Sequence, residues 1–317
     1  MPALREDAVL TPFLGGSVYT FGLYAAAGLL LAAAALGLFG RKVKLPAGTA
    51  PLQALFSLVI GFLLSRLLYG LLDESLGAVM PLWAMVRFDT GGYSLYGALA
   101  GACIAAVLAA KLTHAAPSRC LDILTPAFLL FTAAERLGEG CIEGFGLSRG
   151  LTIPAFCQPW LSVVDDYDTW FLMTWRLECL AALVLCAVLA ADLWKNHRPG
   201  RTFFKFMLLF GATQIIFESL RYDGHMTVRS FVRMEQIFSM VLLGTAVIIL
   251  SVRQWHRQRG LALAALISIP AVTGIAVGIE FMIDRTDISR LLLYIVFIAL
   301  VAVPAVLGFR LLREDRT

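Results

Sequence analysis

The chain has 317 residues, of which 59% are hydrophobic and only 15% are charged. Soluble domains carry about 25% charged residues, so this composition excludes an ordinary water-soluble domain, and its many apolar side chains exclude a disordered chain. The formal net charge of +4 is small and dispersed, which indicates no nucleic-acid partner. The basic residues are therefore interpreted against a membrane.

Apolar stretches of membrane-spanning length recur along the whole chain. A transmembrane helix needs about 20 mostly apolar residues. Eight clear stretches meet the requirement, at 18–39, 51–72, 93–112, 170–193, 203–220, 234–252, 261–283 and 291–312. A ninth stretch, at 121–137, is weaker because it is short and ends in charged residues. We therefore expect an all-α, polytopic membrane protein whose first span is an uncleaved helix rather than a signal peptide.

Lysine and arginine in short loops predict the orientation, because they stay on the cytoplasmic side. With nine spans, we expect the N-terminus outside and the C-terminus in the cytoplasm. Alternate connections carry these basic residues, among them Arg41, Lys42, Lys44, Lys111, Arg119, Lys195, Arg198, Arg253, Arg257 and Arg310. The outer side has three exceptions, for which a phosphate or lipid headgroup is one candidate reason: Arg221, Arg229 and Arg233.

Charged side chains inside spans are costly and suggest function. Arg66 in the second span either serves a site or snorkels to the interface. Arg136 ends the short fourth span and precedes a glycine-rich turn with Glu139 and Glu143. Glycine lets the backbone approach a ligand, and a guanidinium can grip phosphate with two N–H groups. This segment therefore predicts an anion site, and the alternative is a capped helix end with solvated charges.

Two later spans also carry polar residues. Arg176 and Glu178 lie two residues apart in the fifth span, so each is expected to find its partner on another helix. Gln214, Glu218 and Arg221 follow at spacings of four and three, which places them on one helix face. This face either lines an interior cavity or forms a hydrogen-bonded seam between helices.

The remaining candidates are weaker. Gly97 and Gly101 form a GxxxG pattern, which is typical of tight helix packing, and Tyr96 precedes it. The histidines and cysteines lack metal-ligand spacing, so no metal site is expected. Glu280 in the eighth span is interpreted as an interfacial residue and is given no chemical role.

In chain order these segments resemble the bacterial prolipoprotein diacylglyceryl transferase family. GLY at 22–24 and SRLLY at 65–69 resemble its opening helices, and GGYSLYG at 91–97 resembles its glycine-rich stretch. The other similar segments are LD at 121–122 with Pro126, RLG at 136–138, EGFG at 143–146, FESLR at 217–221 and MEQIFSM at 234–240. This resemblance implies a seven-helix core over 1–255 and an additional two-helix segment over 256–317.

The chain departs from the family pattern at defined positions. Family members have His where Tyr96 stands and Asn where Glu139 stands. They have Arg where Gln214 stands, Tyr where Phe210 stands, and one further residue before the equivalent of Glu143. The missing histidine matters most, because a tyrosine with a pKa near 10 is a poor base.

The resemblance implies an enzyme of the bacterial plasma membrane that needs no cofactor. Family members move a diacylglyceryl group from phosphatidylglycerol to the lipobox cysteine thiol of a prolipoprotein and release glycerol phosphate. The implied partners are therefore phosphatidylglycerol, a prolipoprotein signal peptide with its lipobox cysteine, and membrane lipids. The implied catalytic residues are Arg136, Glu143, Tyr96 and Glu218, and the implied substrate-binding residues are Arg66, Glu139, Gly146, Gln214 and Arg221.

Three alternatives stay open. The same scaffold could act on a different lipid or thiol acceptor, or could only bind a lipid or peptide. A secondary transporter is the third alternative, and it is disfavoured because the sequence lacks two related halves with matching broken helices.

Overall fold

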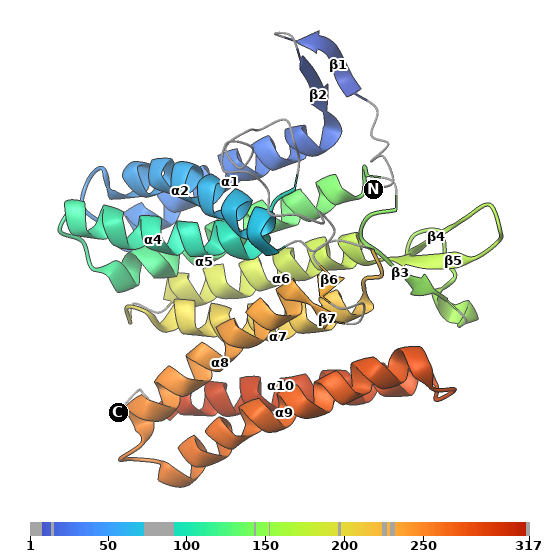
Figure 1. The fold of residues 1–317 in the computed structure, drawn as a ribbon. Coiled ribbons are helices and arrows are strands. Elements are labelled where there is room, and N and C mark those ends of the chain that lie inside the picture. The colour runs from blue at the N-terminus through green and yellow to red at the C-terminus, as the bar shows by residue number, and fades with distance from the viewer. Residues whose placement is uncertain are drawn as a thin grey trace. The chain divides into compact units, whose positions relative to one another are not determined.

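The computed structural model describes residues 8–13, 16–72, 92–142, 144–151, 153–195, 198–223, 227–228 and 232–314. These residues form nine α-helices (Figure 1): α1 (Thr20–Lys42), α2 (Thr49–Leu72), α4 (Leu95–Leu112), α5 (Pro117–Glu139), α6 (Thr174–Lys195), α7 (Arg201–Leu220), α8 (Met234–Gln254), α9 (Arg259–Arg285) and α10 (Arg290–Glu314). Among the described residues, every one of them except α5 is long and apolar enough to cross a membrane. The predicted all-α class is confirmed.

The structure also contains small antiparallel sheets, which the sequence patterns did not predict. They are β1 (Ala8–Phe13) with β2 (Gly16–Tyr19), β3 (Leu147–Gly150) with β5 (Trp170–Met173) and β4 (Ser162–Val164), and β6 (Thr227–Val228) with β7 (Val232–Arg233). The predicted span at 170–193 began too early, because its first four residues are strand β5 and the helix begins at Thr174. A short apolar run fits a strand as well as a helix.

The chain divides into two compact units, which are described separately. The first unit comprises residues 1–200 with 220–225, and the second comprises residues 201–219 with 226–317. Helices α7 and α8 thus group with α9 and α10. The division at residue 255 into a core and an additional segment stays a prediction.

In the first unit, α2 and α4 approach closely through glycine. A Cβ at Gly101 would lie 2.6 Å from the Cα of Gly61, and a Cβ at Gly97 would lie 2.5 Å from the carbonyl oxygen of Leu64. Both distances are far below van der Waals contact with backbone atoms, which cannot move aside. The GxxxG interpretation as a packing motif is therefore confirmed.

Helix α5 makes extensive contacts with both α1 and α6 and further contacts with α4 (Figure 1). An apolar core of α1, α5 and α6 side chains includes Phe39, Ile123 and Leu193. Most α5 residues are buried in protein, including its charged residues Asp122, Arg136 and Glu139. Charges at membrane depth are tolerated where protein surrounds them, which explains why α5 is the least apolar long helix.

The second unit contains α7, α8, α9 and α10. A Cβ at Gly211 of α7 would lie 3.0 Å from the carbonyl oxygen of Ser239 in α8, so these two helices are in close contact. The side chain of Leu208 in α7 reaches Gly308 of α10. Helix α10 therefore packs against α7, which carries Gln214 and Glu218, and α9 contacts α8 and α10.

Candidate active site

Arg136 lies in the last turn of α5 and is almost completely buried, at 2% exposure. Its Nη1 donates a hydrogen bond of 2.6 Å to Oε1 of Glu139, and its Nε lies 2.7 Å from Oε2 of Glu178 in α6. Glu135 Oε2 lies 3.7 Å from the same Nε. The alternative of a helix end with solvated charges is therefore wrong, because Arg136 and Glu139 are both buried.

Arg221 follows α7 in sequence but belongs to the first unit, where it meets the same carboxylates. It forms a β-bridge with Ser148. Its Nη1 donates to Oε2 of Glu139 over 3.1 Å and lies 3.7 Å from Oε1 of Glu178. Its Nε and Nη2 donate to Oδ2 of Asp223 over 3.0 and 2.8 Å. Glu139 thus accepts from both arginines.

These side chains form one buried ion cluster. Two guanidinium groups face four carboxylates within 4.0 Å, so negative charge is in excess among the described residues. Breaking one pair in such a cluster leaves a buried charge unpaired, which costs about 3–5 kcal/mol. The members are Arg136, Arg221, Glu135, Glu139, Glu178 and Asp223.

Two of the three arginines on the predicted outer side, where the positive-inside rule does not expect them, pair with protein carboxylates. Arg221 meets the carboxylates of Glu139 and Asp223, and Nε of Arg233 lies 3.9 Å from Oε2 of Glu218 in the second unit. Arg229 lies outside the described residues. Protein carboxylates thus provide a local reason for two of the three exceptions.

Gly146 connects the glycine-rich turn to the cluster. Its N–H donates to Oδ2 of Asp223 over 2.9 Å, and its carbonyl accepts from Oγ1 of Thr174 over 2.6 Å. Its φ of +61° lies in the left-handed region, and a Cβ there would lie 2.9 Å from the Cβ of Trp175. Glycine is therefore required for both conformation and space. Glu143, in the same turn, lies outside the described residues.

Arg66 of α2 is fully buried and does not snorkel. Its Nη1 donates to the carbonyl oxygen of Gly92 over 2.5 Å, and its guanidinium lies 5.2 Å from the centre of the Tyr93 ring. The neighbouring Ser65 donates from Oγ to the carbonyl oxygen of Ser94 over 2.8 Å. Arg66 therefore holds the segment that leads into α4.

Tyr96 lies in the first turn of α4 and is buried, at 6% exposure. Helix α4 begins with an N-cap, because Oγ of Ser94 accepts a hydrogen bond from the N–H of Gly97. Tyr96 is therefore fixed beside the α2–α4 contact and near the segment that Arg66 holds.

Gln214 and Glu218 lie one turn apart on α7, in the second unit, and each is 2% exposed. Glu218 has Arg233 as an ion-pair partner at 3.9 Å. Oε1 of Gln214 is buried and has no hydrogen-bond partner among the described residues. Because a buried acceptor is normally satisfied, this position is suited to a donor from outside the chain.

Glu280 is buried at 5% exposure, so the interpretation as an interfacial residue is wrong. Its Oε1 accepts a hydrogen bond of 2.8 Å from Nε2 of Gln236 in α8, and Oε1 of Gln236 accepts one of 2.9 Å from the N–H of Arg233. Oη of Tyr294 in α10 donates to the carbonyl oxygen of Ser219 over 3.1 Å. Both C-terminal helices thus contact the elements that carry Glu218 and Arg233.

The fifth-span charges behave differently from each other. Glu178 pairs with Arg136 of α5, as predicted, whereas Nη1 of Arg176 donates to the carbonyl oxygen of Trp160 in a loop rather than to another helix. Glu178 and Asp223 were not among the predicted site residues. Glu178 had a signal, a carboxylate inside an apolar span, whereas Asp223 lies in a polar connection and had none.

The structure brings together some of the predicted site residues. Arg136, Glu139 and Arg221 are in direct contact, and Gly146 joins them through Asp223. Arg66 and Tyr96 belong to the same unit, whereas Gln214 and Glu218 belong to the second unit. Convergence of all these residues on one chamber stays a prediction. They are Arg136, Glu143, Tyr96, Glu218, Arg66, Glu139, Gly146, Gln214 and Arg221.

Comparisons with known proteins identify the family to which the chain belongs. The family model described as prolipoprotein diacylglyceryl transferase matches residues 9–252. A phosphatidylglycerol–prolipoprotein diacylglyceryl transferase from Bacillus cytotoxicus is 25% identical over 262 residues, which cover 80% of this chain and 94% of that protein. The equivalent protein from Limosilactobacillus reuteri is 24% identical over 258 residues, covering 78% of this chain and 92% of that protein. The chain belongs to the prolipoprotein diacylglyceryl transferase family.

Proposed function

We propose that this protein transfers a diacylglyceryl group from phosphatidylglycerol to the lipobox cysteine of a prolipoprotein. The observation that carries the proposal is Arg136, which stands at the arginine of the family motif and is buried in an ion cluster. Its relatives are named for this transfer. The eight apolar helices and the family make the chain a multi-pass membrane protein.

The reaction is a displacement at a tetrahedral carbon. A bond forms between the cysteine sulfur and the glyceryl carbon, the carbon–oxygen bond to phosphate breaks, and glycerol phosphate leaves with the electron pair. The thiol proton passes to a base, since a thiol with a pKa of about 8.5 is only a few per cent ionised near neutrality. The site must therefore supply a proton acceptor and cationic donors for the leaving phosphate.

The ion cluster suits the leaving phosphate in a specific way. Arg136 and Arg221 share the carboxylate of Glu139, so both guanidiniums are held in place before substrate arrives. A bound phosphate accepts hydrogen bonds from arginine N–H groups that Glu139 accepts from in its absence. The cluster already has an excess of negative charge, so the added phosphate is favoured only if a proton neutralises one carboxylate. Glu139 is placed to accept that proton, and Glu178 keeps Arg136 oriented.

The remaining site residues take supporting roles in this proposal. Arg66 positions the segment before α4, and Tyr96 donates a hydrogen bond to the substrate. Glu143 and Glu218 hold the glycerol headgroup, and the amide of Gln214 stands where the family has arginine. Because an amide is neutral, the phosphate relies more heavily on Arg136 than it does in the family.

For the orientation, we propose the bacterial plasma membrane, with α5 as a ninth span buried among the other helices. The N-terminus then lies outside and the C-terminus lies in the cytoplasm. The ends of α1, α6 and α8 carry lysine and arginine, as the cytoplasmic side requires. The ion cluster lies at the opposite end of α5, where an exported prolipoprotein is modified.

A second candidate is transfer from another lipid, or to another thiol, on the same scaffold. Tyr96 and Gln214 favour it, because they replace the family's histidine and arginine. An assay that offers several radiolabelled phospholipids to a lipobox peptide separates the two candidates. Label transferred from phosphatidylglycerol in preference to the other lipids supports the first candidate.

The test of the proposed function is complementation of a transferase-deficient bacterial strain. We expect Arg136→Ala and Arg136→Lys to abolish lipidation, since lysine keeps the charge but loses the two-pronged grip. Arg176→Ala is the matched control, because Arg176 is exposed and contacts the Trp160 carbonyl oxygen and the Trp175 ring rather than a carboxylate of the ion cluster. Full complementation by Arg136→Ala, at equal membrane levels, would remove Arg136 from the mechanism.

A further inference from the structure

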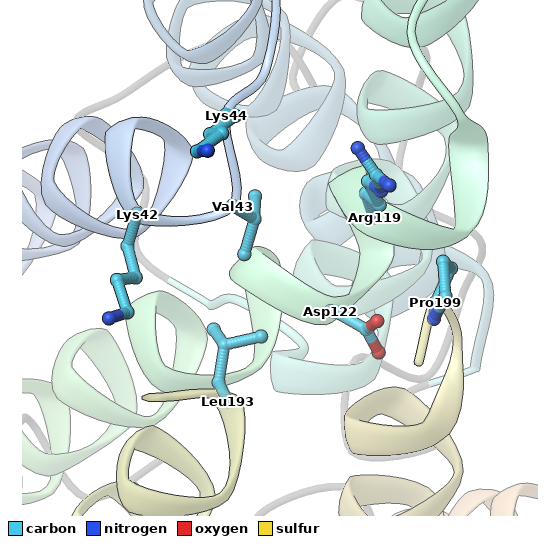
Figure 2. Close-up of a pocket in the computed structure, with 7 residues that line it drawn as sticks. All are labelled: Lys42, Val43, Lys44, Arg119, Asp122, Leu193 and Pro199. Atoms are coloured by element: carbon cyan, nitrogen blue, oxygen red, sulfur yellow. The ribbon is translucent and has the colours of Figure 1, made fainter. Parts of the chain in front are cut away.

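A cavity of about 210 Å³ with a mixed polar and apolar lining lies in the first unit (Figure 2). The end of α1, the start of α5 and the end of α6 surround it. Asp122 in its wall and Arg136 in the cluster are fourteen residues apart on α5, roughly 21 Å at 1.5 Å per residue. The cavity is therefore separate from the candidate active site.

Three of the seven residues that line this cavity are cationic. Lys42, Lys44 and Arg119 contribute three positive charges against the single carboxylate of Asp122 (Figure 2). Asp122 is buried at 3% exposure, and its Oδ2 accepts a hydrogen bond of 2.6 Å from the N–H of Gly200. That carboxylate therefore fixes the loop after α6, and the cavity keeps a net positive charge.

The backbone directs the two lysines. Helix α1 ends in a Schellman motif, with hydrogen bonds from the N–H of Leu45 to the Gly40 carbonyl and from the N–H of Lys44 to the Arg41 carbonyl. Lys44 occupies the left-handed position of this motif, at φ +57°, where glycine is usual. Lys42 Nζ lies 4.4 Å from the centre of the Trp194 ring. The end of α1 thus fixes Lys44 at the cavity, whereas the ammonium of Lys42 lies against Trp194, which is not part of the lining.

The cavity also has an apolar part at a defined depth. Val43 and Leu193 line it beside the cations. Helices α1 and α6 have 23 and 22 residues, so each is about 33–35 Å long and exceeds the roughly 30 Å hydrocarbon layer. Because both helices end at the cavity, its cations fit the level of lipid headgroups, while Val43 and the buried Leu193 belong to the apolar core beneath it.

We propose that this cavity binds the phosphate group of an anionic phospholipid. The cations match a phosphodiester, and the apolar part of the lining matches the carbon atoms of its glycerol. The orientation rule alone requires basic residues in this region but requires no cavity that collects three of them. A soluble phosphate ester shares the recognised group, so the experiment distinguishes the two sources. The inference does not rest on the proposed function.

The test measures amine reactivity at the cavity itself. The full chain is reconstituted in phosphatidylcholine nanodiscs, in nanodiscs that also contain phosphatidylglycerol, and in phosphatidylcholine nanodiscs with millimolar inorganic phosphate. Acetylation rates of Lys42 and Lys44 are read by peptide mass spectrometry and divided by that of Lys111, an exposed lysine outside the cavity. Lipid bound elsewhere leaves this ratio unchanged, and Lys111 corrects for the general surface potential.

We expect phosphatidylglycerol to lower the normalised rate of Lys44 about fivefold. Arg119→Gln, which removes one cation from the rim, is expected to abolish most of this protection, whereas Arg41→Gln, at an exposed position outside the cavity, preserves it. Protection by inorganic phosphate alone assigns the site to a soluble phosphate. An unchanged ratio in both arms, or equal protection in Arg119→Gln and the wild type, overturns the proposal.

Discussion

Removing Arg136 tests the charge balance of the ion cluster most sharply. Its guanidinium lies 2.6 Å from Glu139 and 2.7 Å from Glu178, and the side chain is 2% exposed. In Arg136→Gln, Arg221 alone faces the four carboxylates of the cluster. Two unit charges about 4 Å apart attract by about 4 kcal/mol at an effective dielectric constant of about 20. With desolvation included, we expect the free energy of unfolding to fall by about 3–5 kcal/mol.

Removing a carboxylate from the same cluster has a smaller expected effect. Glu178→Gln leaves three carboxylates against two guanidiniums, so the negative excess falls, and the dipole of the amide oxygen stays beside Nε of Arg136. We expect a loss of about 1 kcal/mol, because one attraction to Arg136 is weakened while one buried negative charge is removed from the excess. The asymmetry between the arginine and glutamate variants therefore follows directly from the four-to-two ratio of the charges.

The assay is equilibrium unfolding in mixed micelles as the fraction of sodium dodecyl sulfate rises, followed by tryptophan fluorescence. Arg176→Gln is the matched control, because this arginine is exposed and donates to the carbonyl oxygen of Trp160. A surface change of this kind stays within about 0.5 kcal/mol. If Arg136→Gln costs no more than Arg176→Gln, or if Glu178→Gln costs more than Arg136→Gln, the account of the cluster is refuted.

Two further variants test the turn and the C-terminal helices. Gly146→Ala brings a Cβ to 2.9 Å from the Cβ of Trp175, so it should destabilise the protein by about 2 kcal/mol and reduce transfer. Gly144→Ala, also at positive φ but with no atom within 4 Å of the new Cβ, should cost about 1 kcal/mol. Equal shifts of the melting temperature in the two variants would contradict this. Glu280→Leu removes the acceptor of the Gln236 hydrogen bond, so it should lower the stability by about 1–3 kcal/mol and also lower the transfer rate. Glu280→Gln should restore most of the stability and most of the rate. An unchanged transfer rate in Glu280→Leu would show that this hydrogen bond has no part in the site.

The helices could be predicted from the sequence because a bilayer demands long apolar segments. Boundaries failed where an apolar run was not helical, as at β5 (Trp170–Met173), whose pairing with neighbouring strands has no local signal. The GxxxG pattern succeeded because Gly97 and Gly101 act through sterics alone. Close helix packing that requires glycine can thus be inferred from the spacing of glycines in the sequence.

The candidate site could be predicted only in part. Arg136 and Glu139 stood out because charge is rare near a span. The contact of Glu139 with Arg221 could not be predicted, because these residues are 82 positions apart in the sequence and only the fold brings them together. Glu280 carried the same signal of a carboxylate inside an apolar span and was misread as interfacial. Its partner Gln236 lies on another helix, 44 residues away, so its burial depends on helix packing that local spacing does not specify.

The central claim is that the purified chain moves a diacylglyceryl group from phosphatidylglycerol to a cysteine thiol. The most direct measurement incubates the wild-type protein with phosphatidylglycerol labelled in its acyl chains and with a lipobox peptide. We predict a labelled thioether on the peptide cysteine and an equal amount of released glycerol phosphate, with neither product from a peptide whose cysteine is replaced by serine. Release of glycerol phosphate without a labelled peptide, or the absence of both products, would contradict the account.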